Sequence, residues 1–339
     1  MRYRSLQRTA ACLAGVILAI ALTREVHAAP AGLSVVAMFP KDSGEFSYAD
    51  LKKARGQTWF AVFKEQFLPS RYLGFEKFLA ATGTDPDSQI DALAWAWVPD
   101  AFEARVSHSA TKAAARGDIV GIAFGRFNPS SADMYFENQG WKPEESHGER
   151  LFPMENGRGP GELYFVFLDS ATAAFGPRDM LERVLNVREG GEESLMRNDE
   201  LYPLIEEAND SSMYWAVLNP AYSQLALQQL APELDRFPMT QRLADRVKNV
   251  IVQVDATDAL TAKFQVVCGS PSDATLMASL IEAGFMLQQN QVKDSNPELA
   301  EILNGATVAS QNDRAKISLS VEAEQMMALL KLKAFAAGS

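Results

Sequence analysis

Asp91-Ala-Leu-Ala-Trp-Ala-Trp-Val98 is the stretch of sequence that decides the fold class. Its residues alternate, so that Leu93, Trp95 and Trp97 point to one side and the alanines between them point to the other. Alternation with a period of two residues is typical of a half-buried β-strand. We expect the apolar stretch 119–127 to continue the same sheet.

Further strands and helices are predicted toward the C-terminus, from apolar periodicity and from turn residues. The first group contains a helix from about Pro129, a hairpin of 150–154 and 162–169, a short strand near 171–175 and a helix from Pro177. The stretch 186–194 is expected to cross the surface. The second group contains strands over 212–218, 248–254 and 261–268, a long helix over 271–289, a short helix from Pro297, a strand pair around 312–313 and a terminal helix carrying Met326.

The N-terminal part of the chain is interpreted in the same way. The apolar run 34–39 is predicted to be a short buried strand that ends at Pro40. A helix is predicted over 48–68 because Phe60, Phe63 and Phe67 fall on one stripe, and a second helix over about 71–81, before Gly83.

The predicted elements recur in a similar order, which indicates a diverged duplication. Residues 36–40 correspond to 215–220, and residues 127–132 correspond to 269–274. In the second pair, Asn128 and Ser270 can each cap a helix whose next residue is Pro. We therefore predict an α+β fold of two similar units, 29–190 and 191–339, each an antiparallel sheet with helices packed on one face.

Residues 1–28 have the three parts of an export signal. Three arginines precede the apolar run 10–22, and a polar end follows with Val26 and Ala28 at the small-residue positions before the cleavage site. The apolar run is shorter than the roughly 20 residues that a membrane-spanning helix needs. The sequence therefore predicts a cleaved signal peptide and a periplasmic or secreted mature protein with no membrane span.

Charge and cysteine content restrict the partners and the bonds of the mature protein. Loss of residues 1–28 removes four Arg and one Glu, which changes the net charge from −11 to −14. A body with this charge repels nucleic acid, so no nucleic-acid partner is predicted. Cys268 is the one cysteine after the signal, so no intramolecular disulfide can form.

Four linked motifs resemble a loosely defined family of secreted bacterial proteins. These motifs are a strand ending in Pro, the turn Gly83-Thr-Asp-Pro-Asp87 before Ile90-Asp91, the strand Gly121-Ile-Ala-Phe-Gly-Arg-Phe-Asn-Pro129, and Ala174-Phe-Gly-Pro-Arg-Asp-Met-Leu181. The resemblance implies a duplicated α+β domain of unknown function. It implies no catalytic residues.

Three patterns resemble catalytic or ligand-binding motifs, and each has a simpler interpretation. Ser109-Ala-Thr-Lys112 has the spacing of serine acyl-enzymes without their partner motifs, so we expect a charged surface loop. Asp85, Asp87 and Asp91 suggest a calcium loop, but Ile90 stands where that loop needs Gly, so we expect a helix-terminating turn. The glycines of 156–161 lie between two strands, so we expect a hairpin loop rather than a phosphate site.

Cysteine and histidine offer no better site. Phe264 and Val266 share a strand face with Cys268, which predicts a buried and inert thiol although a helix begins nearby. His108 and His147 have no second ligand at metal-binding spacing, so both are interpreted as exposed loop histidines. We predict no catalytic residue, no cofactor and no metal.

Trp59, Trp95 and Trp97, with the phenylalanine stripe, are the candidates for an apolar ligand site, although aromatic residues at these spacings more often form core. The sequence favours a non-enzymatic binding or interaction protein of the periplasm or cell envelope, whose partner is an envelope protein or an apolar small molecule. Two alternatives stay open. One is a carrier of an apolar ligand, such as a lipid or lipidated peptide, and the other is a hydrolase that uses carboxylates from distant segments.

Overall fold

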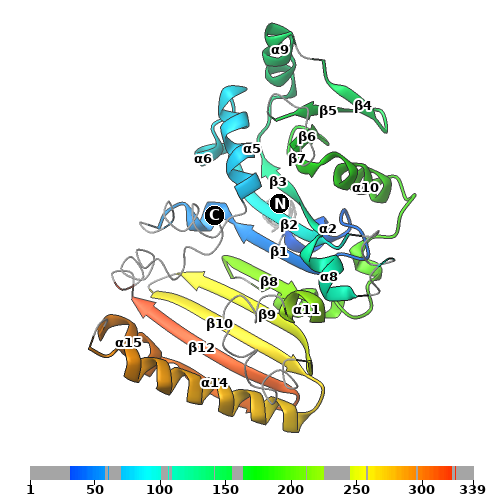
Figure 1. Cartoon of the computed structure of the whole chain (residues 1–339). Coiled ribbons are helices and arrows are strands. Elements are labelled where there is room, and N and C mark those ends of the chain that lie inside the picture. Colours follow the sequence, from blue (N-terminus) through cyan, green and yellow to red (C-terminus); the bar gives the residue numbers. More distant parts are fainter. Residues whose placement is uncertain are drawn as a thin grey trace, which may run out of the picture.

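The computed structural model describes residues 31–322 and residue 325, except for 58–59, 61–69, 101–105, 107–108, 141, 155–162, 211, 225–244, 257–258 and 295–296. In these residues, twelve strands form one antiparallel sheet in the order β11-β12-β10-β9-β8-β1-β2-β3-β7-β6-β5-β4 (Figure 1). The sheet runs the length of the molecule, with β8 and β1 side by side near its middle.

The strands take their bounds from alternating apolar residues and from the turns between them. They are β1 Glu45–Asp50, β2 Ile90–Val98, β3 Asp118–Gly125, β4 Glu144–Ser146, β5 Glu149–Pro153, β6 Leu163–Phe167, β7 Thr172–Pro177, β8 Tyr214–Leu218, β9 Val247–Ala256, β10 Ala259–Cys268, β11 Thr307–Gln311 and β12 Arg314–Glu322.

The helices follow or connect these strands. They are α2 Ala31–Val36, α3 Leu51–Ala54, α5 Ser70–Ala81, α6 Pro86–Gln89, α8 Ala110–Ala115, α9 Pro129–Gln139, α10 Arg178–Arg188, α11 Tyr202–Ala208, α14 Pro271–Val292 and α15 Pro297–Gly305, with a 3-10 turn η1 at Leu195–Arg197. No helix in the described part of the chain is long and apolar enough to cross a membrane.

Helices cover both faces of the sheet. On the first face, α2, α10 and α11 pack over a core that includes Phe46 and Trp215, which are fully buried. On the second face, α5 and α9 pack over one half of the sheet through residues such as Phe75 and Phe136. Over the other half of the second face lie α14 and α15, as Figure 1 shows for α14 beside β10 and β12. Between these two pairs of helices, no described helix covers the middle of the second face.

The α+β class and the antiparallel sheet are as predicted, but the arrangement differs from two separate sheets. Strand β1 pairs with β8 from Glu45↔Leu218 to Ala49↔Tyr214, and this pairing joins the strands of 29–190 and 191–339 into one sheet. Helices also lie on both faces instead of one. The physical reason is that β2, β3 and β7 have apolar residues on both sides, so both faces of this part of the sheet need cover.

Two N-terminal predictions are wrong. Residues 31–36 form helix α2, not a strand over 34–39, because a short apolar run carries no periodicity that separates the two. The helix predicted over 48–68 is strand β1 and then the short helix α3 at its beginning. Residues 58–59 and 61–69, which held most of that prediction, lie outside the described part. The segments predicted to form a signal peptide, the loop 156–161 and a terminal helix also lie outside it.

The remaining predicted elements are present, with ends that shift by a few residues. Strand β2 alternates as expected, since Ala94 and Ala96 lie in the core of the first face and Leu93 and Trp95 in that of the second face. Helices α9 and α14 begin after Asn128 and Ser270, whose side chains accept hydrogen bonds from backbone N–H groups in the first turn. The capping residues thus fix where both helices begin.

Candidate functional site

The middle of the second face brings together residues from β8, β1 and β2. In the register of β1 with β2, Glu45 is opposite Trp97 and Ser47 is opposite Trp95. In the register of β1 with β8, Ala49 is opposite Tyr214. Directly opposed residues in an antiparallel pair point to the same side of the sheet, so these side chains share the second face. We call Glu45, Ser47, Trp95, Trp97, Tyr214 and Tyr222 the central cluster.

Aromatic rings form the walls of the central cluster. Trp95 and Tyr214 are stacked across β1, with ring centroids 5.9 Å apart and an interplanar angle of 24°. Trp97 packs against Tyr222 at 6.0 Å. Asn219 caps the turn after β8 by accepting a hydrogen bond from the backbone N–H of Tyr222 at 3.1 Å, which positions that ring over the end of β2.

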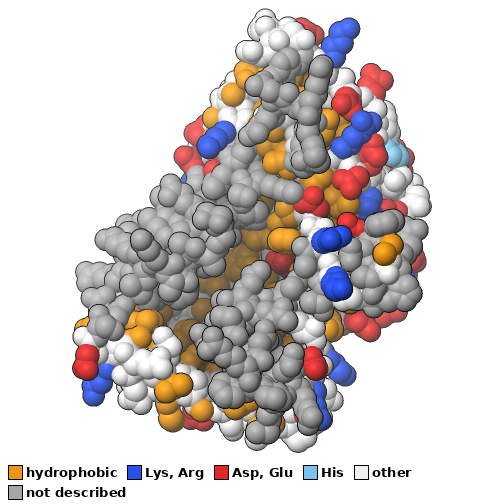
Figure 2. Space-filling view, viewed as in Figure 1, with side chains coloured by type: hydrophobic (Ala, Val, Ile, Leu, Met, Phe, Trp, Pro, Cys, Tyr) orange, Lys and Arg blue, Asp and Glu red, His pale blue; other side chains and the backbone are white. Residues whose placement is uncertain are grey.

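Small residues occupy the same face beside these rings. Ser47 and Ala49 of β1 and Ala216 of β8 are almost fully buried, with 0%, 4% and 1% of their surface exposed. Viewed from this side, the molecule has a hollow over its central strands, lined by hydrophobic side chains (Figure 2). An apolar hollow of this kind is a common form of ligand site.

Two glycines allow Tyr222 to lie close to the backbone. A Cβ atom at Gly44 would lie 2.1 Å from the Tyr222 ring. A Cβ atom at Gly117 would lie 2.8 Å from both Trp97 Nε1 and Tyr222 Oη. Both positions therefore need glycine for the ring to pack as it does.

Glu45 is the charged residue of the central cluster. Ser47 Oγ donates a hydrogen bond to Glu45 Oε1 at 2.9 Å and lies 3.4 Å from Tyr214 Oη. Burial raises the pKa of Glu45, and hydrogen bonds from the side chains of Ser47 and Trp95 oppose this rise without cancelling it. No lysine or arginine in the described part of the chain forms an ion pair with Glu45.

The two neighbouring tyrosines respond to the same surroundings. Burial, and to a lesser extent the nearby Glu45 carboxyl group, raise the pKa of Tyr214 and of Tyr222. Trp97 Nε1 and Tyr222 Oη are buried and have no hydrogen-bond partner. Buried polar atoms of this kind are rare in folded proteins and cost free energy. The cluster thus contains hydrogen-bonding capacity that the protein itself does not use.

The structure brings two of the three predicted tryptophans together. Trp95 is buried and Trp97 is partly exposed, on one face as predicted. Trp59 lies outside the described residues. Glu45, Tyr214 and Tyr222 were not predicted, because they reach the cluster through the pairing of β1 with β2 and β8. The available signal for Glu45 was the alternation of the polar Glu45 and Ser47 with the aromatic Phe46 and Tyr48.

The other motifs have structural roles. Ser109 accepts a hydrogen bond from the backbone N–H of Lys112 at 3.3 Å and caps α8, so the segment is a helix start and not the loop expected. Asp85 accepts from the backbone N–H of Asp87 at 3.1 Å and caps α6. His147 Nδ1 is 2.9 Å from Glu189 Oε2. Within the described residues, no group of three or more potential metal ligands occurs.

Cys268 is buried, as predicted. It lies among Val266, Ala274 and Met277 in the core beneath α14. Burial, with smaller contributions from the carboxylates of Asp273 and Asp313, raises the pKa of its thiol to about 11. A thiol with a raised pKa carries little thiolate at neutral pH and is a poor nucleophile.

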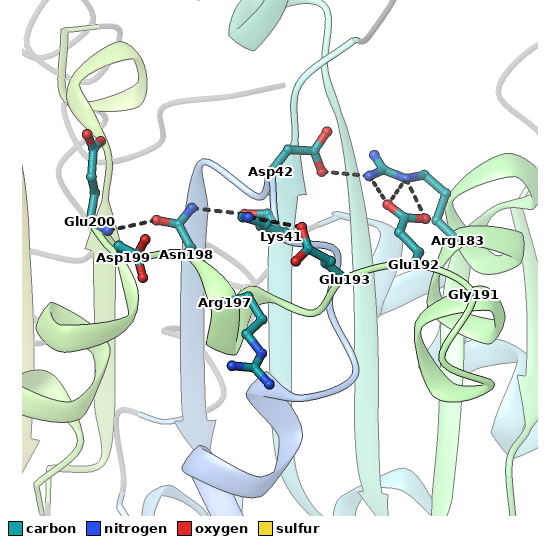
Figure 3. Close-up of a pocket in the computed structure, with 10 residues that line it drawn as sticks. All are labelled: Lys41, Asp42, Arg183, Gly191, Glu192, Glu193, Arg197, Asn198, Asp199 and Glu200. Atoms are coloured by element: carbon teal, nitrogen blue, oxygen red, sulfur yellow. Dashed lines mark hydrogen bonds and ion pairs between the residues drawn. The ribbon is translucent and has the colours of Figure 1, made fainter.

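A charged pocket of about 770 Å³ lies where 186–194 crosses the surface. Figure 3 shows that its ion pairs join residues that line it, such as Arg183 with Asp42 and Glu192, and Lys41 with Glu193. Lys41 Nζ and Glu193 Oε2 are 2.9 Å apart. Backbone hydrogen bonds from Lys41 to Glu193 and from Leu195 to Phe39 attach the crossing to the segment before β1. These contacts hold the segment between α10 and α11 against the residues before β1, so we interpret the charged pocket as part of a structural connection.

Comparisons with known proteins give little further information. No protein-family model matches the chain, and no curated protein matches it. Among solved structures, crystal forms I, III and IV of TP0453 are similar to it, at 11%, 11% and 10% sequence identity and TM-scores of 0.48, 0.47 and 0.46. The matches cover 87–88% of this chain and 96–98% of TP0453.

Proposed function

We propose that this protein is a non-enzymatic binding protein of the cell envelope, and that its ligand is an apolar molecule held at the central cluster. The observation that supports this proposal is the hydrophobic hollow over the central strands (Figure 2), on the face of the sheet where Trp95 and Tyr214 are stacked. Concave apolar surfaces that carry a few polar groups are typical of small-molecule sites.

The neighbouring strand extends the apolar surface. Val250, Val252 and Val254 of β9 are opposite Leu218, Ala216 and Tyr214, so all of them lie on the second face, and the three valines are only partly buried. An apolar ligand over this surface would remove these side chains from water. At roughly 25 cal/mol per Å² of apolar area, burial of even 100 Å² is worth about 2.5 kcal/mol before the cost of association.

Binding of the neutral dye N-phenyl-1-naphthylamine tests this proposal. We expect its fluorescence to rise on addition of the wild-type protein, and Val252→Trp, which fills the surface next to Ala216, to weaken binding at least tenfold. Lys263→Trp is the matched control, because Lys263 is exposed on the opposite face of β10. Absence of dye binding, or equal loss in both variants, would contradict the proposal.

The envelope location rests on residues 1–28, as a proposed signal peptide with cleavage after Ala28. N-terminal sequencing of protein from the envelope fraction of a bacterial host tests it. We expect a chain that begins at Ala29. A chain that retains Met1 and stays in the cytoplasm would contradict this part of the proposal without affecting the ligand site.

We also propose that the chain is a diverged duplication. From the junction of β1 and β8 outward, the first half has the order β1-β2-β3-β7-β6 and the second half has β8-β9-β10-β12-β11. In both halves, the capped helix with Pro at its start follows the third strand, as α9 follows β3 and α14 follows β10. In this correspondence β8 is the counterpart of β1. The sequence motifs instead pair residues 215–220, which include most of β8, with residues 36–40.

A further inference from the structure

Glu45 is an unusual neighbour for an apolar ligand. It projects from the second face of β1, between Leu218 of β8 and Trp97 of β2, where the surrounding side chains are aromatic or aliphatic. A carboxylate in apolar surroundings costs free energy unless a positive charge or several hydrogen bonds compensate it. Ser47 and Trp95 each supply one side-chain hydrogen bond, and no lysine or arginine of the described residues is paired with the Glu45 carboxyl group.

The aromatic rings around Glu45 have the chemistry that attracts cations. The faces of tryptophan and tyrosine rings bind ammonium groups electrostatically, and the attraction increases where water is excluded. Trp95 and Tyr214 lie on one side of Ser47, and Trp97 and Tyr222 lie beside Glu45 itself. Four rings and one carboxyl group therefore lie together on the second face of the sheet.

We propose that Glu45 and these four rings form the head-group site for an organic cation, so that the ligand has an apolar chain and a positively charged amine or ammonium head. The inference rests on the proposed function, because the hydrocarbon part of the ligand occupies the apolar hollow. The head lies against the Glu45 carboxylate and the rings, and the chain extends over Ala216 toward β9.

Three further points favour a cation over an anion or a neutral head. An anionic head would add a second negative charge beside Glu45 and would leave the Glu45 carboxylate without compensation. The mature chain has a net charge of −14, which raises the local concentration of cations around it. Tyr222 Oη, which is buried and unpaired, can accept a hydrogen bond from an N–H of an amine head.

Three probes with the same chain and different head charges test the inference by isothermal titration calorimetry. They are octyltrimethylammonium, octanol and octyl sulfate. For the wild-type protein at about pH 8, we expect the cation to bind about tenfold more tightly than octanol, because the Glu45 carboxylate attracts the charged head. We expect octyl sulfate to bind most weakly.

The variant Glu45→Gln keeps the shape of the side chain and removes its charge. We expect it to bind the cation and octanol with similar affinity, while octanol binding stays near its wild-type value. Glu193→Gln is the matched control, since Glu193 is an exposed carboxylate in the charged pocket and should leave the preference unchanged. Circular dichroism confirms that both variants are folded.

A second measurement does not depend on any variant. Binding of a cation with a fixed charge favours the ionised form of Glu45, so the wild-type protein should release a proton on binding as the pH falls toward the raised pKa of this group. Titrations in buffers with different ionisation enthalpies detect that release. Equal binding of the cation and octanol, or a preference that Glu45→Gln leaves intact, would overturn the inference while octanol binding still supports an apolar site. Failure of all three probes would overturn the proposed function as well.

Discussion

Glu45 places a carboxyl group on a face of the sheet that is otherwise apolar. Its pKa is higher in the folded protein than the usual 4.5, mainly because of burial. The folded state therefore binds this proton more tightly than the unfolded state does, and the group stabilises the fold most at acid pH. As the pH rises above the unfolded pKa, that contribution is lost progressively.

The neutral variant Glu45→Gln should lack this contribution to the pH dependence of stability. We expect its free energy of unfolding in urea to exceed that of the wild type at about pH 8, and the difference to shrink toward about pH 4, where Glu45 is protonated in the wild type. Glu137→Gln, an exposed substitution on α9, serves as the control and should change stability little at either pH. A difference that grows on acidification would contradict the assignment of burial as the cause.

Cys268 provides a second residue-level prediction. Because the thiol is buried beneath α14 and its pKa is raised to about 11, we expect native protein to react with a thiol-specific dye at least a hundredfold more slowly than protein unfolded in urea. Absorbance of the released dye product measures both rates at the same pH. Rapid labelling of the native protein would show that the thiol is accessible.

At the scale of single elements, helices α9 and α14 begin in the same way. Asn128 Oδ1 accepts from the backbone N–H of Ser131 at 3.2 Å, and Ser270 Oγ accepts from that of Asp273 at 3.2 Å. Substitution of each cap by Ala should lower the free energy of unfolding by about 1 kcal/mol. Urea denaturation checks this, with the exposed Ser130→Ala as a control that should be nearly neutral.

The same elements show which features a sequence can predict. Strand β2 was predictable because its alternation spans a whole strand, and α9 and α14 were predictable because a cap and a proline mark their first turn. Strand β1 was missed. Its alternation of Phe46 and Tyr48 with Glu45 and Ser47 has polar residues on a face that is apolar elsewhere, and the phenylalanines that follow favoured a helix.

The candidate site was predictable only in part, because its residues come from segments that are far apart in the sequence. Trp95 and Trp97 belong to one strand, so local periodicity places them on one face. Glu45, Tyr214 and Tyr222 join them through strand pairs between residues that are far apart in sequence. Such pairings depend on the whole sheet, and no local pattern determines them.

For the molecule as a whole, the pairing of β1 with β8 makes one sheet of the two halves. The core of the first face contains residues of both halves, with Phe46 and Tyr48 of β1 against Trp215 of β8 at centroid distances of 5.4 and 5.7 Å. We expect unfolding in differential scanning calorimetry to occur as one transition, with equal calorimetric and van't Hoff enthalpies.

The variant Trp215→Ala tests whether the packing between β1 and β8 makes the two halves unfold together. Loss of a large buried side chain should cost about 3–5 kcal/mol and should lower the temperature of the single transition without splitting it. Met196→Ala, at an exposed position in η1, is the control and should leave the transition nearly unchanged. Two separate transitions in the wild type would show that the halves unfold independently.

The order of the strands also determines which strands could pair with the sheet of a second copy of this protein. In the part of the chain that the structure describes, β4 and β11 are the two strands at the edges of the sheet. Strand β4 is three residues long and carries two glutamates, and β11 ends in Ser310 and Gln311. Short, polar edge strands of this kind oppose growth of the sheet into fibrils by pairing between copies.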